Sequence, residues 1–393
     1  MRGLRKYLTP FAPDQSGAMS VLYELGGLIA ICDAGGCTGN VCGFDEPRWF
    51  EQKSALFSAG LRDMDAILGR DDRLVEKLVD AASKLDVKFV AIIGTPVPAV
   101  IGTDYKALGR MCEKRLNMPV ITIDTDGMEL YDVGEEKAWL ELFGTFAEKG
   151  KPNLDIEKKR GKIGVLGLTP QDTSDFQAPK KIREYYQEKE GKEAICYCMG
   201  ENVGRMVYGL DNDRTAGEVE KNIVVSPAAL AAAKYLEKTF GTPYEVTYPI
   251  VEELVPDMDY RGKKILIVHQ QVIGNAMRAE IRRRCQKVNG DPSVDNNAVI
   301  TVASWFMMKQ ELSEEGDISL REEDDYMELV REEDYDIVFA DPMMKRMTED
   351  AYKMAGTGYA ADAYETERKK FFIDATHFAV SGKLREEMKK REA

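Results

Sequence analysis

The sequence predicts an α/β protein of three doubly wound domains, each a parallel sheet covered by helices on both faces, around a central crevice. The first observation behind this prediction is that short, nearly continuous apolar runs, rich in β-branched residues, alternate with amphipathic segments of helical length. The second is that two polar stretches, 150–162 and 256–264, interrupt this alternation, and each leads into a fresh apolar run. The length of 393 residues suits two or three domains.

The apolar runs place ten expected strands in order along the chain. The first domain has LIAIC (28–32), FVAII (89–93) and VITI (120–123). The second has IGVL (163–166), AICY (194–197) and IVV (223–225). The third has ILIV (265–268), VITV (299–302), IVF (337–339) and FFI (371–373). Ten strands are too many for one small sheet, so the polar stretches set the predicted domains: 1–155, 156–260 and 261–393. Because ligands bind beyond the carboxyl ends of the strands in such Rossmann-like sheets, the crevice is the expected site.

Composition argues against several classes of function. The chain has 54 lysine and arginine residues against 68 aspartate and glutamate residues, and this net charge of −14 disfavours a nucleic-acid partner. Two histidines are too few for a His-rich metal site, and seven cysteines do not suggest a secreted disulfide framework. No apolar run is long enough to cross a membrane, and the N-terminus lacks a signal-peptide core. We therefore expect a cytoplasmic protein with reduced thiols and no membrane partner.

One segment, 311–336, is unusually acidic, with 13 acidic residues and two basic ones, Arg321 and Arg331. A solvated helical face or surface insertion is the simpler interpretation, and a docking patch for a basic partner is the alternative.

The cysteines near the N-terminus suggest a metal site. Cys32 ends a predicted strand, a turn through Asp33, Gly35 and Gly36 follows, and Cys37 then lies at the carboxyl end of the sheet, with Cys42 five residues on. Glycines beside a cysteine let the backbone approach a bulky group, and iron–sulfur clusters take thiolate ligands. A small buried thiol beside a turn is the alternative. Nucleotide binding is disfavoured because the turn has neither a P-loop lysine nor the G-x-G-x-x-G spacing.

Two further features lie at the carboxyl ends of predicted strands. The loop 94–102 follows a predicted strand and leads into a helix, so it shares the edge that carries Cys37. Cys196 and Cys198 are two residues apart on a predicted strand, so their thiols face one side, and buried strand cysteines are the simpler interpretation. Cys112 and Cys285 fall in helical patterns and are expected to pack.

Several of these stretches, in the same order, resemble nitrogenase component 1 proteins. APDQSGA precedes the first strand, and that strand leads into a turn ending in Gly36-Cys37. SAGLRDMDAILGRDDRLVEKLVDA and VIGTDYKALGRMCEKRLNMPVI are similar to two helix-containing segments of the family's first domain. KNIVVSPAALAAAKYLEKTFGTPY is similar to a strand–helix–return segment of its second domain.

The resemblance implies a partial set of ligands. Family members hold an iron–sulfur cluster at a subunit interface with up to three cysteines from the first domain, of which the middle one matches Cys37. The other two would fall near Phe11 or Ala12 and near Pro96, where this chain has no cysteine. A cofactor-ligating cysteine of molybdenum nitrogenase corresponds to Ser226, and its histidine ligand falls close to His377. We therefore expect no iron–molybdenum cofactor and no nitrogen fixation.

A [4Fe–4S] cluster shared across a subunit interface is the expected cofactor. Four thiolates are needed, and a two-fold dimer would supply them as Cys37 and Cys42 from each protomer. A heterodimer with a related component 1 subunit that carries more cysteines is the competing arrangement.

Three hypotheses of function follow. The leading one is a nitrogenase-like oxidoreductase subunit that takes electrons from an ATP-hydrolysing iron protein and reduces a substrate in the crevice. Asp33, His269 and His377 are its candidates for proton delivery. The alternative is a non-catalytic scaffold for cluster assembly, because two of the family's cysteines are missing. The third is a small-molecule binding or sensor protein without metal.

Overall fold

The computed structural model describes residues 5–50, 54–62, 69, 71–147, 161–199, 217, 219–287, 297–354 and 370–377. Within these residues the chain forms three sheets, of four, four and five strands. All strand pairs whose register is known are parallel, so the predicted fold class is confirmed.

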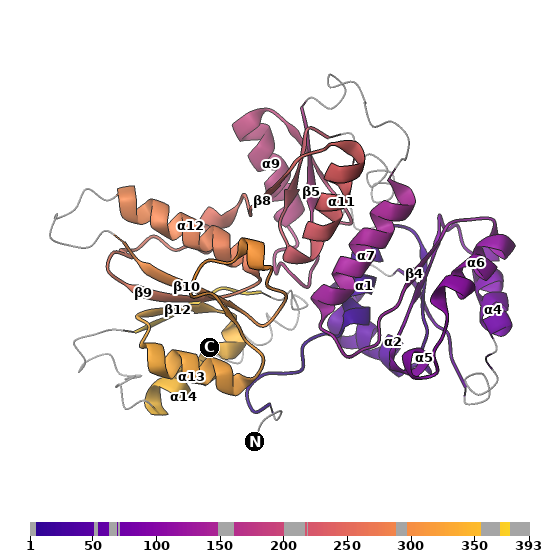
Figure 1. Ribbon diagram of the computed structural model, residues 1–393, viewed down its shortest axis with the longest axis horizontal. Coiled ribbons are helices and arrows are strands. Elements are labelled where there is room, and N and C mark those ends of the chain that lie inside the picture. Colours follow the sequence, from indigo (N-terminus) through magenta and orange to yellow (C-terminus); the bar gives the residue numbers. More distant parts are fainter. Residues whose placement is uncertain are drawn as a thin grey trace. The chain divides into compact units, whose positions relative to one another are not determined.

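The first sheet has the order β2-β1-β3-β4. Its strands are β1 (Leu28–Ile31), β2 (Ala55–Ser58), β3 (Val90–Ile93) and β4 (Val120–Ile123). Helices α4 (Asp71–Ser83) and α6 (Tyr105–Leu116) cover one face, and α1 (Asp14–Leu22) and α7 (Tyr131–Phe146) cover the other (Figure 1). The short helices α2 (Gly36–Asn40) and α5 (Pro96–Val100) follow β1 and β3 at the carboxyl edge.

Helices α1 and α7 touch backbone to backbone. A Cβ atom added to Gly17 would lie 1.8 Å from the Tyr131 carbonyl oxygen, and one added to Gly134 would lie 1.8 Å from the Asp14 carbonyl oxygen. Only glycine leaves room for this approach.

The second sheet has the order β6-β5-β7-β8. It consists of β5 (Lys162–Leu166), β6 (Glu193–Cys196), β7 (Lys221–Val224) and β8 (Tyr244–Val246), with helices α9 (Ala178–Glu190) and α11 (Leu230–Phe240).

The third sheet has the order β11-β10-β9-β12-β13. Its strands are β9 (Lys264–Val268), β10 (Val299–Ser304), β11 (Ile318–Ser319), β12 (Ile337–Ala340) and β13 (Phe371–Asp374). Helix α12 (Gln271–Lys287) lies on one face, and α13 (Glu323–Glu333) and α14 (Lys345–Met354) lie on the other (Figure 1).

The described residues cluster into two compact units. One contains residues 11–224 and 228–245, with the first and second sheets, and the other contains residues 5–10, 225–227 and 246–377, with the third sheet. The predicted boundary at 155/156 lies outside the described residues. The boundary at 260/261 falls between β8 and β9, and the three-domain division stays a prediction.

All ten predicted strands are present, and three more, β2, β8 and β11, were not predicted. Each of the three is an edge strand of partly or fully exposed residues, with an apolar run of at most three residues. An edge strand is buried on fewer sides than a central one, so it has a weaker sequence signal.

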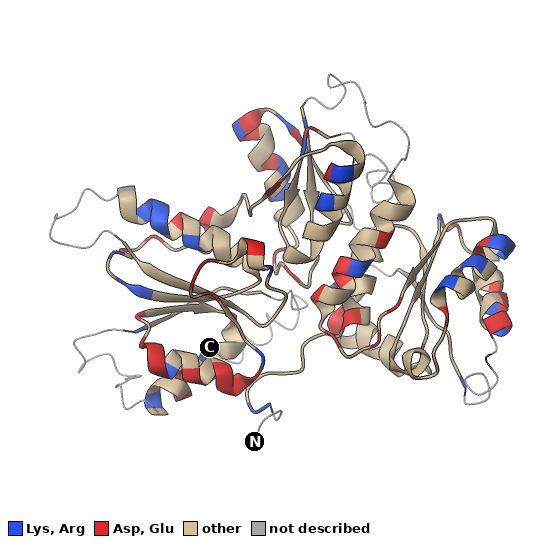
Figure 2. Ribbon diagram, viewed as in Figure 1, with Lys and Arg blue, Asp and Glu red and all other residues tan. Residues whose placement is uncertain are grey.

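Acidic residues gather on α13, as Figure 2 shows. Asp324, Glu328 and Glu332 are exposed at four-residue spacing, as expected for a solvated helical face. Other acidic groups of the segment are structural, because the Asp317 carboxylate accepts a 2.5 Å hydrogen bond from Arg278 and the Asp336 carboxylate accepts the Lys264 N–H at 2.9 Å. A docking role for the patch stays a prediction. No helix in the described part of the chain is both long enough and apolar enough to cross a membrane.

Candidate functional site

The turn after β1 places Cys37 at the carboxyl edge of the first sheet. Gly35 has φ +117°, a backbone conformation that favours glycine, and α2 begins at the next residue. Asp33 holds the turn, because its carboxylate accepts hydrogen bonds from the Thr38 N–H (2.7 Å), the Thr38 hydroxyl (3.0 Å) and the Ser58 hydroxyl (2.5 Å). The buried Asp33 side chain therefore orients the helix that carries Cys37, and its suggested part in proton delivery stays a prediction.

Cys37 and Cys42 differ from the other cysteines in exposure. All seven cysteines lie in the described residues and none forms a disulfide, but only Cys37 and Cys42 are partly exposed. Cys42 follows α2 in a single π-helical segment, Val41–Asp45. An external group can therefore reach these two thiols and not the buried ones.

Burial and the nearby Asp33 carboxylate raise the pKa of the Cys37 thiol, although a hydrogen bond with the Thr95 side chain opposes this. The uncomplexed side chain is therefore a neutral thiol at pH 7, and a metal that binds it would displace a proton.

The edge around Cys37 is open and apolar. A Cβ atom at Gly36, Gly39 or Gly43 would meet no other atom within 4 Å. Large apolar side chains at this edge of the sheet are exposed, including Phe44 (83%), Val100 (86%) and Met128 (81%). Val97 and Ile101, in the same segment as Val100, are also exposed. Exposed apolar surface of this kind marks an interaction site.

These residues fit half of a cluster site. Two accessible thiols in one chain are too few for the four thiolates of a [4Fe–4S] cluster. Within the described residues no three His, Cys, Asp or Glu side chains come together as a metal site. A [4Fe–4S] cluster at this edge would need further thiolates from a second subunit, and the ligand roles of Cys37 and Cys42 stay predictions.

A buried ion cluster lies directly after the thiol segment. The Arg48 guanidinium donates to both Glu46 carboxylate oxygens (2.7 and 2.8 Å), to Glu24 (2.9 Å) and to the Ser20 carbonyl (2.6 Å), and it lies 4.6 Å above the Tyr23 ring. Sequence reasoning missed this cluster, because burial of a charged residue leaves no periodic pattern.

The two histidines lie together at the carboxyl edge of the third sheet. The His269 and His377 rings are stacked, with centroids 4.5 Å apart and planes 10° apart, and Phe306 packs on His377 at 4.8 Å. The Asp341 carboxylate accepts the His377 backbone N–H at 2.9 Å. The sequence predicted each histidine as a candidate for proton delivery but did not predict that they touch.

Burial lowers the pKa of His269 to about 4, against the opposing effect of a hydrogen bond to the Thr376 backbone. Its Nδ1 accepts the Gln270 N–H at 2.8 Å, so the ring is neutral with its proton on Nε2. A role of either histidine in proton delivery stays a prediction.

Three other positions considered as metal or substrate ligands, Cys196, Cys198 and Ser226, are buried. Cys196 ends β6, and Cys198 follows it with φ +66°. Ser226 follows β7 and is fully buried. Nothing in the structure tests a metal or substrate role for these three residues.

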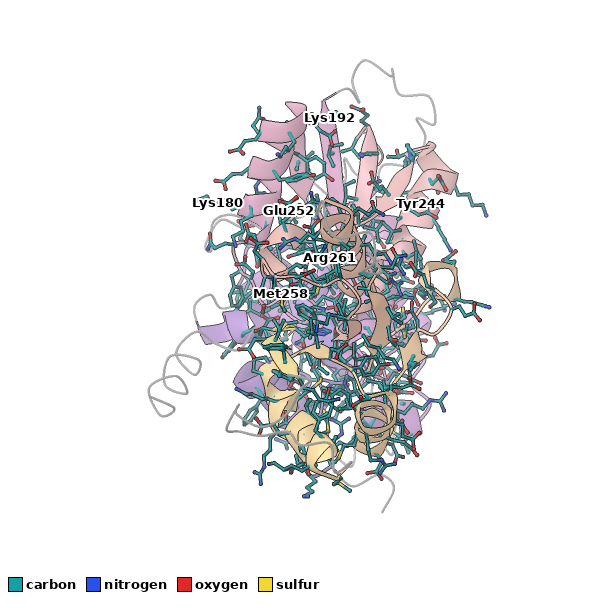
Figure 3. All side chains as sticks on the ribbon, turned by 90° about the vertical axis from the view of Figure 1, so that its left-hand side faces the viewer. Lys180, Lys192, Tyr244, Glu252, Met258 and Arg261 are labelled. Atoms are coloured by element: carbon teal, nitrogen blue, oxygen red, sulfur yellow. The ribbon has the colours of Figure 1, made fainter. Side chains whose placement is uncertain are left out.

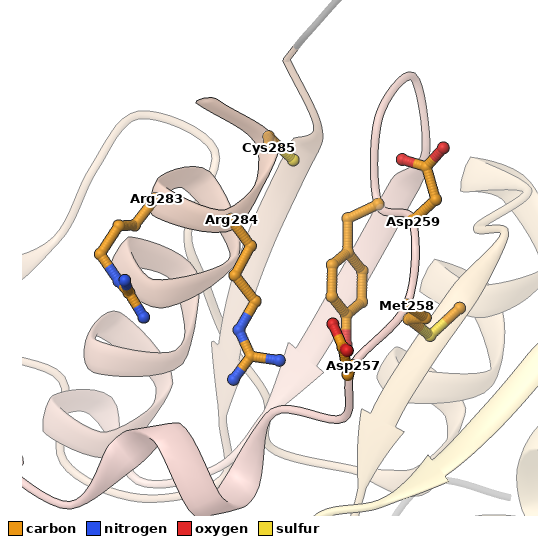
Figure 4. Close-up of a pocket in the computed structure, with 7 residues that line it drawn as sticks. Asp257, Met258, Asp259, Arg283, Arg284 and Cys285 are labelled. Carbon is orange, nitrogen blue, oxygen red and sulfur yellow. The ribbon is translucent and has the colours of Figure 1, made fainter. Parts of the chain in front are cut away.

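A surface pocket of about 390 Å³ lies in the third-sheet unit, beside the loop that carries Met258 and Arg261 in Figure 3. Figure 4 shows Arg283 and Arg284 on one side of it and acidic residues opposite. Arg283 donates to the Glu280 and Glu252 carboxylates, and Arg284 donates to Glu280 and the Pro256 carbonyl. Because both guanidinium groups are already paired, this pocket is a weaker candidate than the rim at Cys37.

Comparison with known proteins adds a family relationship. A family model described as nitrogenase component 1 type oxidoreductase matches residues 15–251. Curated relatives include proteins named nitrogenase iron-molybdenum cofactor biosynthesis protein NifE. The one from Bradyrhizobium diazoefficiens is 23% identical to this chain, and the alignment covers 48% of this chain and 32% of the relative. The one from Clostridium pasteurianum is 25% identical, and the alignment covers 50% of this chain and 40% of the relative. A third, from Klebsiella pneumoniae, is 25% identical, and the alignment covers 48% of this chain and 41% of the relative. The matched region thus spans well under half the length of these relatives.

Solved structures of nitrogenase Cp1 share the fold. The structure at pH 6.5 has a TM-score of 0.63 at 13% identity and covers 99% of this chain and 93% of that one. The structure at pH 5 has a TM-score of 0.60 at 14% identity, with coverages of 88% and 82%.

Proposed function

The chain belongs to the nitrogenase component 1 type oxidoreductase family, and from that premise we propose that it is a non-catalytic scaffold that holds an iron–sulfur or related metal cluster during cluster assembly. The cluster is then cargo, bound at Cys37 and Cys42 on the rim of the first sheet.

The observation that carries this proposal is the accessibility of the two thiols. Cys37 and Cys42 lie on an edge where glycines leave open space and where Phe44 and Val100 are almost fully exposed. A cluster bound at such an edge can be loaded from outside and released again. The names of the curated relatives refer to cofactor biosynthesis and support the same choice.

We propose a homodimer around a shared [4Fe–4S] cluster. A two-fold axis at the Cys37 rim doubles each ligand, so two protomers supply four thiolates and bury the exposed apolar side chains against each other. A heterodimer with a related component 1 subunit is the competing arrangement, and measurement of the native mass distinguishes the two.

The first experiment is iron and acid-labile sulfide analysis of the protein purified anaerobically. We expect bound iron in the wild-type protein, loss of most of it in Cys37→Ala and Cys42→Ala, and a folded protein in each case. Cys112→Ala is the matched control, because Cys112 is buried on α6 and should affect packing without affecting iron. Wild-type iron content in Cys37→Ala, or an iron-free wild-type protein, would exclude the site.

The second experiment separates the scaffold from the catalytic hypothesis. A scaffold transfers its cluster to an apo-protein acceptor, measured as iron appearing on the acceptor after separation. Rapid ATP-dependent reduction of a retained cluster by an iron protein, without transfer, would instead favour the reductase. Native mass spectrometry of the protein with and without its bound cluster then measures whether the protein is a dimer in each state.

A further inference from the structure

Cys37 and Cys42 lie in one continuous helical segment whose two ends are held by different groups. The end at Cys37 is held by the Asp33 carboxylate, which accepts hydrogen bonds from α2. The other end is the π-helical turn Val41–Asp45, which contains Cys42. Of the five residues of this turn, all of them described, Val41 alone is buried. Burial therefore fixes the beginning of the turn but not its end.

Two hydrogen bonds close the turn, and each spans five residues. The Glu46 N–H donates to the Val41 carbonyl at 2.9 Å, which is the backbone bond that defines a π turn. The Asn40 side-chain amide donates to the Asp45 carboxylate at 2.7 Å. Because π turns are rare and frequently occur at functional sites, a side chain that reinforces one beside a candidate ligand is informative.

Asp45 also connects the end of the turn to two other parts of the same unit. The Ser16 hydroxyl, on α1, donates to Asp45 Oδ2 at 2.7 Å, and Oδ2 is also the atom that accepts from Asn40. The Gln171 side-chain amide, in the loop after β5, donates to the Asp45 carbonyl oxygen. Ser16 and Gln171 are both buried, so these donors are fixed in place. The first and the second sheet thus each contribute a contact to the end of this turn.

We propose that Asp45 is a positioning residue for Cys42, which fixes the π-helical turn so that this thiol is in place before a cluster binds. The inference rests on the proposed function, in which Cys42 is a ligand. A thiol on a loose segment would lose conformational freedom when metal binds, and that loss would weaken binding. Because Asp33 holds Cys37 independently, the two thiols have separate supports.

The test is amide hydrogen exchange of the metal-free full chain. Asp45→Ala removes both hydrogen bonds to Oδ2, so we expect exchange of the Glu46 N–H, which closes the turn, to become about tenfold faster or more. The Thr38 N–H should keep its exchange rate, because it is bound to Asp33 at the other end of the segment. Unchanged exchange at Glu46 would show that other contacts hold the turn and would overturn the proposal.

Asp45→Asn is the conservative variant. Since both hydrogen bonds go to one oxygen, the single amide oxygen of asparagine can accept both, and Glu46 exchange should stay close to the wild-type rate. Equal acceleration in Asp45→Asn and Asp45→Ala would contradict the proposal. Asp126→Ala is the matched control, because the Asp126 carboxylate accepts the Met128 N–H of its own loop, and it should leave Glu46 exchange unchanged.

Ser16→Ala removes one of the two bonds and provides the measurement if Asp45→Ala does not fold. It should accelerate Glu46 exchange by less than Asp45→Ala, and no acceleration would count against the proposal.

Alkylation of the metal-free protein by iodoacetamide, followed for each cysteine by mass spectrometry, reports on the thiol itself. In Asp45→Ala the rate at Cys42 should rise several-fold relative to that at Cys37, while the buried Cys112 stays protected. A general loss of structure would instead expose Cys112. An unchanged ratio of Cys42 to Cys37 would overturn the proposal.

Iron analysis separates this inference from the proposed function. An iron-free wild-type protein would exclude the scaffold, and the exchange and alkylation results would still decide whether Asp45 positions Cys42. Where the wild-type protein holds iron, Asp45→Asn should retain it and Asp45→Ala should lose most of it. Equal retention by the two variants would contradict a positioning role.

Discussion

Several charged side chains are buried in specific hydrogen-bonded surroundings. Arg48, Glu46, Asp33 and Glu135 are all nearly or fully buried, and each has a specific partner in its surroundings. Their sequence neighbourhood gives no indication of this, because a charged residue in a polar stretch is usually exposed. The sequence therefore predicted the thiols and Asp33 of the candidate site, but not the buried charges of Arg48, Glu46 and Glu135.

Replacing Arg48 by methionine should be strongly destabilising. The change leaves Glu46 and Glu24 without their cation in a buried place, and breaking such a pair costs about 3–5 kcal/mol. Denaturant unfolding measures the loss. Lys84→Met, which breaks an exposed pair with Asp80, is the control and should change stability by less than about 1 kcal/mol. Equal effects of the two substitutions would contradict the assignment of Arg48 as a buried structural cation.

His269 should make the protein sensitive to mild acid. Its folded pKa of about 4 lies below its unfolded value of about 6.5. The stabilisation is therefore present above pH 6.5 and is lost as pH falls toward 4, by up to about 3 kcal/mol. Because the chain has two histidines, NMR of the imidazole signals can follow His269 directly once His269→Asn has assigned them. A midpoint near 6.5 for His269 would contradict its burial as a neutral ring.

Among the described elements, every central strand was predicted, whereas only three of the six edge strands, β4, β6 and β13, were. The four residues of β1 and of β3 are fully buried, so an unbroken apolar run identifies each of them. In contrast, β2 has the pattern of two half-buried and two exposed residues, and β11 has only two residues. The π-helical segment after α2 also has no sequence signal of its own.

The contact between α1 and α7 should not tolerate a methyl group. Gly17→Ala would push Cβ against the Tyr131 carbonyl, and we expect a loss of at least about 1–3 kcal/mol. Gly144→Ala on α7 is the matched control, because nothing lies within 4 Å of its added Cβ. It should stabilise the helix by about 0.5–1 kcal/mol. Thermal unfolding distinguishes the two, and a stable Gly17→Ala protein would contradict the close approach of these helices.

For the whole molecule, the alternation of apolar runs and amphipathic segments was enough to predict three parallel sheets, and the resemblance to nitrogenase component 1 proteins is confirmed. The grouping into two units was not predictable, because it depends on contacts between distant segments. Residues 5–10 show this, since they belong to the unit of the third sheet although the chain then enters the unit of the first.

Glu323 anchors this N-terminal segment. Its carboxylate accepts the N–H groups of Lys6 (2.7 Å), Tyr7 (2.9 Å) and Leu8 (2.7 Å). Glu323→Gln removes the charge and half of the acceptor capacity, so we expect amide exchange at residues 6–8 to become about tenfold faster or more. Asp324→Asn, at an exposed neighbouring position, should leave that exchange unchanged. Equal protection in both variants would show that other contacts hold the segment.

The separation of more than 300 residues between Glu323 and its partners has a consequence for biosynthesis. At about 5–20 residues per second, a ribosome needs roughly 15–60 seconds to reach Glu323 after it has made Leu8. During that interval residues 6–8 have no Glu323 carboxylate to bind, while the first two sheets can already assemble. In the nascent chain, residues 6–8 therefore stay without this anchor, and open to proteases and chaperones, until synthesis reaches α13.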